Sequence, residues 1–268
     1  MSTYKMIGID YDTFKFQSGE INVKLKSMFL DKDVTIIGSP QSSDEIMELL
    51  CLVDALRRKG VINLSLVMPY VMYSRDDRVC QEGQQLGASV FASLINSCNF
   101  TSVTTYDNHS DVITALLNNC TNKGKVSILG HSMPNLSDKY DHLVAPDAGS
   151  IKQVQELATW SRVPMLRADK TRDLLTGNIT GTVVYSEDLE GKSCLIVDDI
   201  CAGGKTFIEL AKALKAKGAG EITLYVTHLF VHKGLEELRE AGISKFITTN
   251  SVVPYSVSSL EEVKVIKL

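Results

Sequence analysis

The segment LIVDDICAGGKTF, residues Leu195–Phe207, joins an apolar strand to a helix through two aspartates and a glycine-containing loop. An apolar run that leads directly into a helix is typical of a strand buried in a parallel sheet. Backbone N–H groups in a small-residue turn, at the positive end of a helix, bind anionic phosphate groups. The carboxylates of Asp198 and Asp199 stand where sugar hydroxyls can donate to them. We therefore expect an α/β fold with a phosphosugar site at this loop.

Short β-branched runs alternate with helical periodicity along the chain, which is the pattern of a parallel α/β sheet. The clearest helix follows Ser43 and ends near Gly60, with an acidic first turn, a basic last turn and one apolar face. A second helix over residues 206–217 places the glycine loop at a helix N-terminus. The expected strands span residues 34–38, 62–70, 102–107, 126–130, 142–146, 163–166, 194–198 and 222–227.

The length of the chain and one polar stretch predict two domains. With 268 residues and 44% hydrophobic content, the chain can form two cores. Residues 131–141 carry turn chemistry without periodicity, which is typical of a domain boundary. We expect an N-terminal domain over residues 1–134 and a C-terminal domain over residues 135–268.

Charge and cysteine usage exclude several classes of protein. The net charge of −4 supplies no basic field for nucleic acid or for an anionic membrane. No segment approaches the roughly 18 apolar residues that a membrane span needs. The six cysteines show no paired spacing, which is typical of reduced thiols and argues against a zinc site. We expect a cytoplasmic protein that binds neither nucleic acid nor membrane.

The aspartate–glycine loop has three other local interpretations. GGKT resembles the end of a Walker A loop, but that motif requires glycine where Asp199 stands. Paired aspartates also occur in the Mg²⁺ pocket of flavodoxin-like receivers, which do not continue into A-G-G-K-T. A structural strand–helix turn with incidental acids is the third interpretation.

Seven segments carry a further signal; in chain order they are FKFQSGEINVKL (14–25), EIMELLCLVDALRR (45–58), MPYVMYSRDDR (68–78), TYDNHS (105–110), APDAGS (145–150), DKTRD (169–173) and VDDICAGGKT (197–206). Together they resemble one family, the ribose-phosphate pyrophosphokinases. VDDICAGGKT also resembles the phosphate loop of type I phosphoribosyltransferases. The resemblance implies two phosphoribosyltransferase-like α/β domains, each with a mainly parallel sheet flanked by helices. It also implies transfer of the β,γ-diphosphate of ATP to the anomeric hydroxyl of ribose 5-phosphate, with release of AMP.

The resemblance implies an ATP site in the N-terminal domain. An aromatic ring such as that of Phe16 is a natural platform for adenine. Phe16 taken alone would more often be an ordinary core residue, but within FKFQSGE the nucleotide role is favoured. Ser18 stands where the family has an acid or amide, and Asp76 where the family commonly has glutamine. The implied ATP-binding residues are Phe16, Ser18, Glu20, Arg75, Asp76 and His109.

The same resemblance implies Mg²⁺ as cofactor, with Asp107, His109 and Asp147 around the metal and the phosphates. It implies Lys170 and Arg172 as catalytic residues, together with His109. The first two lie in RADKTRDLLTGNITG, a polar and turn-rich segment that suits a mobile loop closing over ATP. From composition alone, Lys170 and Arg172 would be interpreted as surface charges.

The sugar-phosphate loop departs from the family, in which it usually reads D-T-x-G-T. Methyl and hydrogen at Ala202 and Gly203 open space, and Lys205 offers a charge to a second phosphate group. Ribose 5-phosphate is the default acceptor, because related transferases with A-T-G-G-T or D-T-G-K-T still bind a plain 5-phosphate. The alternative is ADP-ribose, whose 5-oxygen carries a diphosphate. The implied sugar-phosphate residues are Asp198, Asp199, Ala202, Gly203, Gly204, Lys205 and Thr206.

Two further alternatives are a phosphoribosyltransferase and a non-catalytic regulatory homologue. The first would not need FKFQSGE, YSRDDR or DKTRD, and the second would be expected to lack Lys170, Arg172 or the metal-associated acids. Family members are commonly hexamers with an ATP site shared between subunits, so we expect a homo-oligomer, a dimer or larger.

Overall fold

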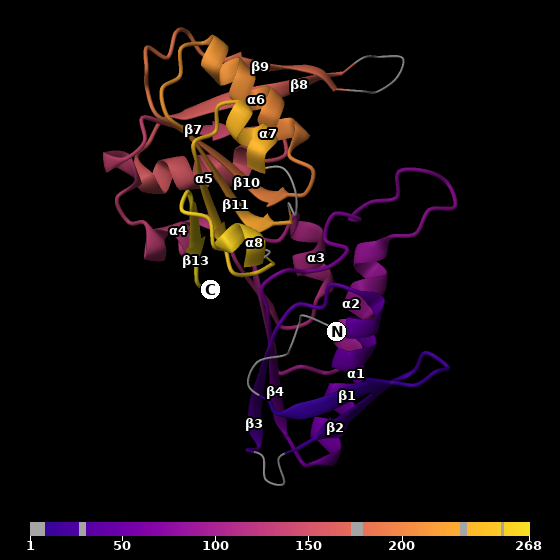
Figure 1. The fold of residues 1–268 in the computed structure, drawn as a ribbon. Helices are drawn as coiled ribbons and strands as arrows, with labels where there is room; N and C mark the ends of the chain where they lie inside the picture. The colour runs from indigo at the N-terminus through magenta and orange to yellow at the C-terminus, as the bar shows by residue number, and fades with distance from the viewer. Residues whose placement is uncertain (1–8, 27–30, 173–178, 231–234, 253–254) are drawn as a thin grey trace. The chain divides into compact units, whose positions relative to one another are not determined.

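The computed structural model describes residues 9–26, 31–172, 179–230, 235–252 and 255–268 (Figure 1). The chain divides into two compact units, Met1–Lys123 and Gly124–Leu268. The expected boundary after residue 134 is therefore too late in the sequence. Residues 126–130, expected as a strand, belong to helix α4 (Lys125–Ser132), which packs against α5 (Ile151–Ser161) of the second unit.

The first unit contains a four-stranded parallel sheet in the order β3-β4-β5-β6 and a separate antiparallel hairpin, β1–β2. Leucines of α1 that recur at helical spacing, Leu49, Leu52 and Leu56, are fully buried in its core. The strands are β1 (Tyr11–Lys15), β2 (Ile21–Leu25), β3 (Asp33–Ile37), β4 (Asn63–Met68), β5 (Ser102–Tyr106) and β6 (Cys120–Lys123). The helices are α1 (Ser43–Arg58), α2 (Gly87–Ser97) and α3 (Asp111–Leu116).

The second unit contains a seven-stranded sheet in the order β13-β12-β11-β10-β7-β8-β9. Every pairing in it is parallel except the one between β8 and β9. The strands are β7 (His142–Ala145), β8 (Met165–Arg172), β9 (Ile179–Tyr185), β10 (Cys194–Cys201), β11 (Ile222–Leu229), β12 (Lys245–Thr249) and β13 (Val263–Ile266). Besides α4 and α5, the helical elements are η1 (Leu136–Asp138), α6 (Lys205–Ala216), α7 (Leu235–Glu240) and α8 (Tyr255–Ser258).

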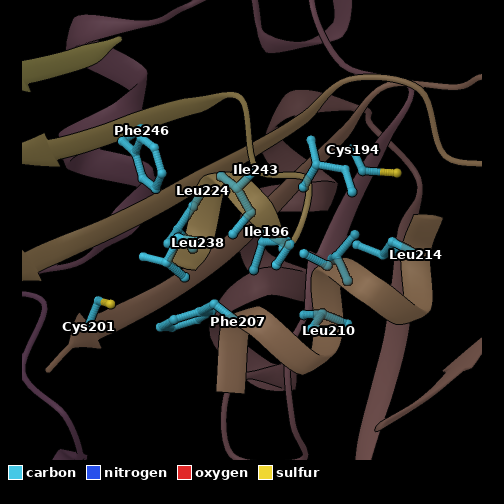
Figure 2. Packing of buried hydrophobic residues seen from close by; sticks show 14 of the residues in the cluster. Cys194, Ile196, Cys201, Phe207, Leu210, Leu214, Leu224, Leu238, Ile243 and Phe246 are labelled. Carbon is cyan, nitrogen blue, oxygen red and sulfur yellow. The ribbon is translucent and has the colours of Figure 1, made fainter. Parts of the chain in front are cut away.

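Helix α6 is fixed to this sheet by its apolar face. Phe207, Leu210 and Leu214 point from α6 toward Ile196 on β10 and Leu224 on β11, and all five are buried (Figure 2). Burying a side chain of this size stabilises the folded state by roughly 1.5–3 kcal/mol. The start of α6, and with it the loop after β10, is thereby held at the carboxyl edge of the sheet.

The α/β expectation is confirmed, and the expected strands other than 126–130 each overlap a strand of the structure. Patterns of hydrophobicity missed the hairpin β1–β2, because four of the five residues of β1 are exposed and show no apolar alternation. All six cysteines are free thiols. None of the helices in the described part of the chain combines the length and hydropathy that crossing a bilayer requires.

Candidate functional site

The carboxyl end of β10 carries two adjacent carboxylates. Asp199 is buried and Asp198 is partly buried, and the backbone N–H of Asp199 donates to Asp198 Oδ1 at 3.0 Å. Burial and the neighbouring Asp199 charge raise the pKa of Asp198 well above its ordinary value. A buried pair of like charges is costly, so it is typical of a site where a ligand supplies compensating groups.

The loop after β10 leads into α6 through a left-handed residue. Gly204 has φ +73°, and its carbonyl accepts from the N–H groups of Phe207 at 2.9 Å and Ile208 at 3.0 Å. A Cβ at Gly204 would make only ordinary van der Waals contact with the Leu238 side chain, at 3.5 Å, so the left-handed backbone is what favours glycine here. The N-cap residue of α6 is Gly204 itself, which has no side chain to accept from the first N–H groups of the helix. The first turn of the helix is therefore arranged to receive an anion from outside the chain.

The three residues that differ from the family pattern face solvent. Ala202, Gly203 and Lys205 are exposed, whereas Gly204 between them is buried. A Cβ built at Gly203 would meet no atom of the described residues within 4 Å. The structure thus places open space and a positive charge at the two ends of one short turn.

Asp147 follows β7, the neighbour of β10 in the sheet. The register pairs Ile196 with Val144, so Asp147 and the β10 aspartates emerge at the same edge. The Asp147 Oδ1 atom accepts from the N–H groups of Gly149 at 3.1 Å and Ser150 at 3.2 Å, which fixes the turn into α5. The Asp147 charge also raises the pKa of Asp198.

A lysine that sequence patterns did not single out acts electrostatically on this acidic edge. Lys125, the first residue of α4, is 3% exposed, and its ammonium donates to Gln153 Oε1 on α5. The Lys125 charge lowers the pKa of Asp198 and so opposes the effects of burial and of the other aspartates. No motif signals this residue, because its position depends on how α4 packs.

Lys170 and Arg172 lie on a strand, whereas a loop was expected. Both belong to β8, with Lys170 opposite Thr182 and Arg172 opposite Ile179 on β9, and a bulge separates Thr171 from Arg172. The β-branched residues of this polar segment pair readily in a two-stranded ribbon, which explains the difference. The side chains of Lys170 and Arg172, and residues 173–178 of the expected loop, are outside the described part of the structure.

The turn of the β1–β2 hairpin collects three of the expected ATP-binding residues. Phe16 N–H donates to the Glu20 carbonyl at 2.9 Å, and the Ser18 hydroxyl donates to the Glu20 carboxylate. Phe16 is 46% exposed, and its ring meets the exposed ring of Phe14 edge-on, with centroids 4.3 Å apart. Phe16 is therefore available to stack on a ligand, and an ordinary core residue would not be.

Arg75 and Asp76, which follow β4, differ in their surroundings. Arg75 is exposed. Asp76 Oδ2 accepts from Gln85 Nε2 at 3.0 Å and from the Gly87 N–H at 3.1 Å, so it holds the start of α2. These contacts give Asp76 a structural role, and the expected contact with ATP stays a prediction.

Asp107 and His109 follow β5. Asp107 is buried with φ +48°, a strained value for a residue with a side chain, and its N–H donates to the Lys123 carbonyl at 3.0 Å. His109 is exposed. Strained backbone at a strand end is common at functional sites. Here the strained residue, Asp107, is a buried acid, and the His109 imidazole two residues later is accessible.

The donor set suits Mg²⁺. Over the described ranges, no group of three or more histidine, cysteine, aspartate or glutamate side chains could hold a metal alone. Mg²⁺ is usually bound through one or two carboxylates together with substrate phosphates and water. Asp107 and Asp147 could each supply one such carboxylate, in the first and second units respectively.

Two family profiles match most of the chain. One describes the N-terminal domain of ribose phosphate pyrophosphokinase and matches residues 3–98, and one describes the phosphoribosyl transferase domain and matches residues 128–259. Ribose-phosphate pyrophosphokinase from Shewanella oneidensis is 32% identical over 264 residues, 95% of this chain and 82% of that protein. The protein of the same name from Thermosipho africanus is 30% identical over 250 residues, 91% of this chain and 78% of that protein.

A solved structure agrees with the observed fold. Phosphoribosylpyrophosphate synthetase from Mycobacterium smegmatis superposes with a TM-score of 0.83 at 22% identity. The match covers 97% of this chain and 86% of that one. The likeness extends over both units and confirms the α/β architecture.

Proposed function

Because the chain belongs to the ribose-phosphate pyrophosphokinase family, with its two phosphoribosyltransferase-type domains, we propose that it makes a phosphoribosyl pyrophosphate-type product. It is a transferase of the pyrophosphokinase type. The anomeric hydroxyl oxygen of a 5-phosphorylated ribose forms a bond to the β-phosphorus of ATP. The bond from that phosphorus to the oxygen bridging the α- and β-phosphates breaks, AMP leaves, and the hydroxyl proton is released.

The acceptor site at the edge of β10 carries this proposal. Asp198 and Asp199 accept hydrogen bonds from the ribose hydroxyls, and residues 202–206 receive the 5-phosphate at the uncapped start of α6. Lys170 and Arg172 neutralise charge on the transferred diphosphate. Phe16 stacks on adenine, and Arg75 and His109 contact the ATP phosphates. Bound Mg²⁺ supplies further neutralisation of the triphosphate.

One assay tests the activity. The protein is incubated with ATP, Mg²⁺ and either ribose 5-phosphate or ADP-ribose, and the released nucleotide is identified by chromatography. We expect AMP in equal amount to a diphosphorylated sugar. Release of ADP would indicate an ordinary kinase, and no turnover with either acceptor would overturn the proposal.

ADP-ribose is the second candidate acceptor, favoured by the open space at Gly203. A 5-diphosphate needs room beyond the first phosphate and a charge for the second, and exposed Gly203 and Lys205 supply both. In the same assay, an acceptor-dependent release of AMP with ADP-ribose supports this candidate. Turnover of ribose 5-phosphate alone rejects it.

Gly203→Thr separates the two acceptors. A Cβ at this position meets none of the described residues within 4 Å, so the fold should tolerate the substitution and only a bulky 5-substituent should clash. We expect kcat/KM for ADP-ribose to fall about tenfold relative to that for ribose 5-phosphate, the scale of a pocket that loses one or two methylene volumes. Ala216→Thr, at the exposed far end of α6, is the matched control. An equal change for both acceptors would contradict a role of Gly203 in acceptor choice.

Phe16→Ala tests the adenine contact. Stacking of a base on an aromatic ring contributes about 1–3 kcal/mol, so KM for ATP should rise by roughly tenfold or more while KM for the acceptor is unchanged. Phe14→Ala removes a similarly exposed ring from the same hairpin and serves as the control. If the two variants raise KM for ATP equally, Phe16 has no special role.

A further inference from the structure

Lys125 is a charged side chain buried among residues of the second unit and absent from every motif described above. It is 3% exposed, and lysine is almost never buried to this extent unless its charge is paired. Its ammonium donates to Gln153 Oε1, which neutralises no charge because the amide is uncharged. The compensating negative charge therefore comes from elsewhere in the unit.

The topology places that negative charge at the end of β10. Gln153 lies in the first turn of α5, directly after the Asp147 turn, and β7 and β10 are adjacent parallel strands. The lysine, held to Gln153, is thus anchored at the edge where Asp147, Asp198 and Asp199 emerge. Burial and the charges of Asp199 and Asp147 raise the pKa of Asp198. The Lys125 charge lowers it.

We propose that Lys125 is a positioning residue of the acceptor site: its buried ammonium, fixed by Gln153, is the internal counter-charge of the Asp198–Asp199 pair, and acceptor binding depends on it. The inference rests on the proposed function, since it assigns the two aspartates to the acceptor ribose. Three acids at one edge repel one another, and a fixed buried cation offsets this repulsion before any ligand arrives. The aspartates can then keep the orientation in which they accept from the sugar hydroxyls.

Lys125→Met removes the charge and keeps most of the side-chain volume. We expect the Kd for the acceptor, ribose 5-phosphate or ADP-ribose, measured by calorimetry without ATP, to rise at least tenfold. KM for ATP should change by less than threefold, about one kT of free energy. Lys125→Arg should restore most of the binding, because it keeps the charge. Lys212→Met, on the exposed face of α6, is the control for loss of a lysine in the same unit.

A stability measurement tests the charge pairing without any ligand. Breaking a buried ion pair leaves one charge uncompensated, so Lys125→Met should lower the melting temperature. The same substitution in an Asp198→Asn background should lower it much less, because the orphaned charge is absent. If Lys125→Met does not fold, Gln153→Leu, which frees the ammonium from its anchor, should weaken acceptor binding in the same assay.

The outcomes separate this inference from the proposed function. If the wild-type protein binds neither acceptor, the proposed function fails. If the wild type binds an acceptor and folded Lys125→Met binds it equally well, the inference is wrong and the function stands. The inference would also be overturned if Lys125→Met lowered the melting temperature equally in the wild-type and the Asp198→Asn backgrounds.

Discussion

Replacing Lys170 with alanine should lower kcat by about a hundredfold to a thousandfold, the usual effect of removing one preorganised group that stabilises transition-state charge. The negative charge that develops at the attacked phosphoryl group and on the departing AMP oxygen appears only as the bond to AMP breaks. KM for ATP and for the acceptor should therefore change by less than about threefold, because uniform binding is retained. Steady-state kinetics of the purified variant with both substrates varied independently measures the two effects.

The position of Lys170 makes this substitution a clean test. Its backbone is paired with Thr182 on β9, and a side-chain replacement leaves that pairing in place. Lys264→Ala, at an exposed position on strand β13 of the same sheet, is the matched control and should leave kcat unchanged. Activity retained in Lys170→Ala would show that the family's catalytic assignment does not carry over to this chain.

Local strand–turn–helix patterns predicted the strand and the helix that flank the proposed acceptor site. Asp198, Asp199 and the following loop are consecutive in sequence, so a single buried strand and a single helix start fix them together. The same logic predicted α1 and α6, whose apolar faces and end signals lie within one segment. Such features need no knowledge of which distant segments pack together.

Features that depend on packing between distant segments were not predictable. Lys125 reaches the acidic edge only because α4 is a helix packed on α5, and the sequence VSILG looked like a strand. Asp76 was expected to contact ATP. Its carboxylate instead accepts a hydrogen bond from the Gly87 N–H, and no local sequence pattern relates these two residues. The strand conformation of Lys170 requires the partner strand β9, which hydrophobic alternation did not reveal.

Asp198→Asn should separate activity from stability with opposite signs. A hydrogen bond to a charged group contributes about 1.5–3 kcal/mol, so kcat/KM for the acceptor should fall by about a hundredfold while KM for ATP is retained. The same substitution removes one of the three carboxylates at this edge. It relieves their mutual repulsion and still leaves Asp147 and Asp199 beside the proposed counter-charge, Lys125, so the lysine is not orphaned. In EDTA the melting temperature of the variant should exceed that of the wild type by at least about 2 °C, since about 1 kcal/mol shifts proteins of this size by 2–4 °C.

The higher melting temperature of Asp198→Asn should depend on pH, because burial and the Asp199 charge raise the pKa of Asp198. The folded state binds the Asp198 proton more tightly than the unfolded chain, so wild-type stability falls as pH rises from the ordinary aspartate range through the raised pKa. The advantage of Asp198→Asn should therefore be small near pH 4 and grow toward neutral pH.

Asp141 provides a control of opposite sign in the same unit. Hydrogen bonds from the side chain and backbone of Ser193, at 2.7 and 2.8 Å, lower the pKa of Asp141. That carboxylate stabilises the fold above its ordinary pKa and loses this effect as pH falls, so Asp141→Asn should lower the melting temperature at neutral pH and leave kcat unchanged. If Asp198→Asn lowered the melting temperature as Asp141→Asn does, Asp198 would be a stabilising carboxylate. The acceptor site would then hold no stored electrostatic repulsion for a ligand to relieve.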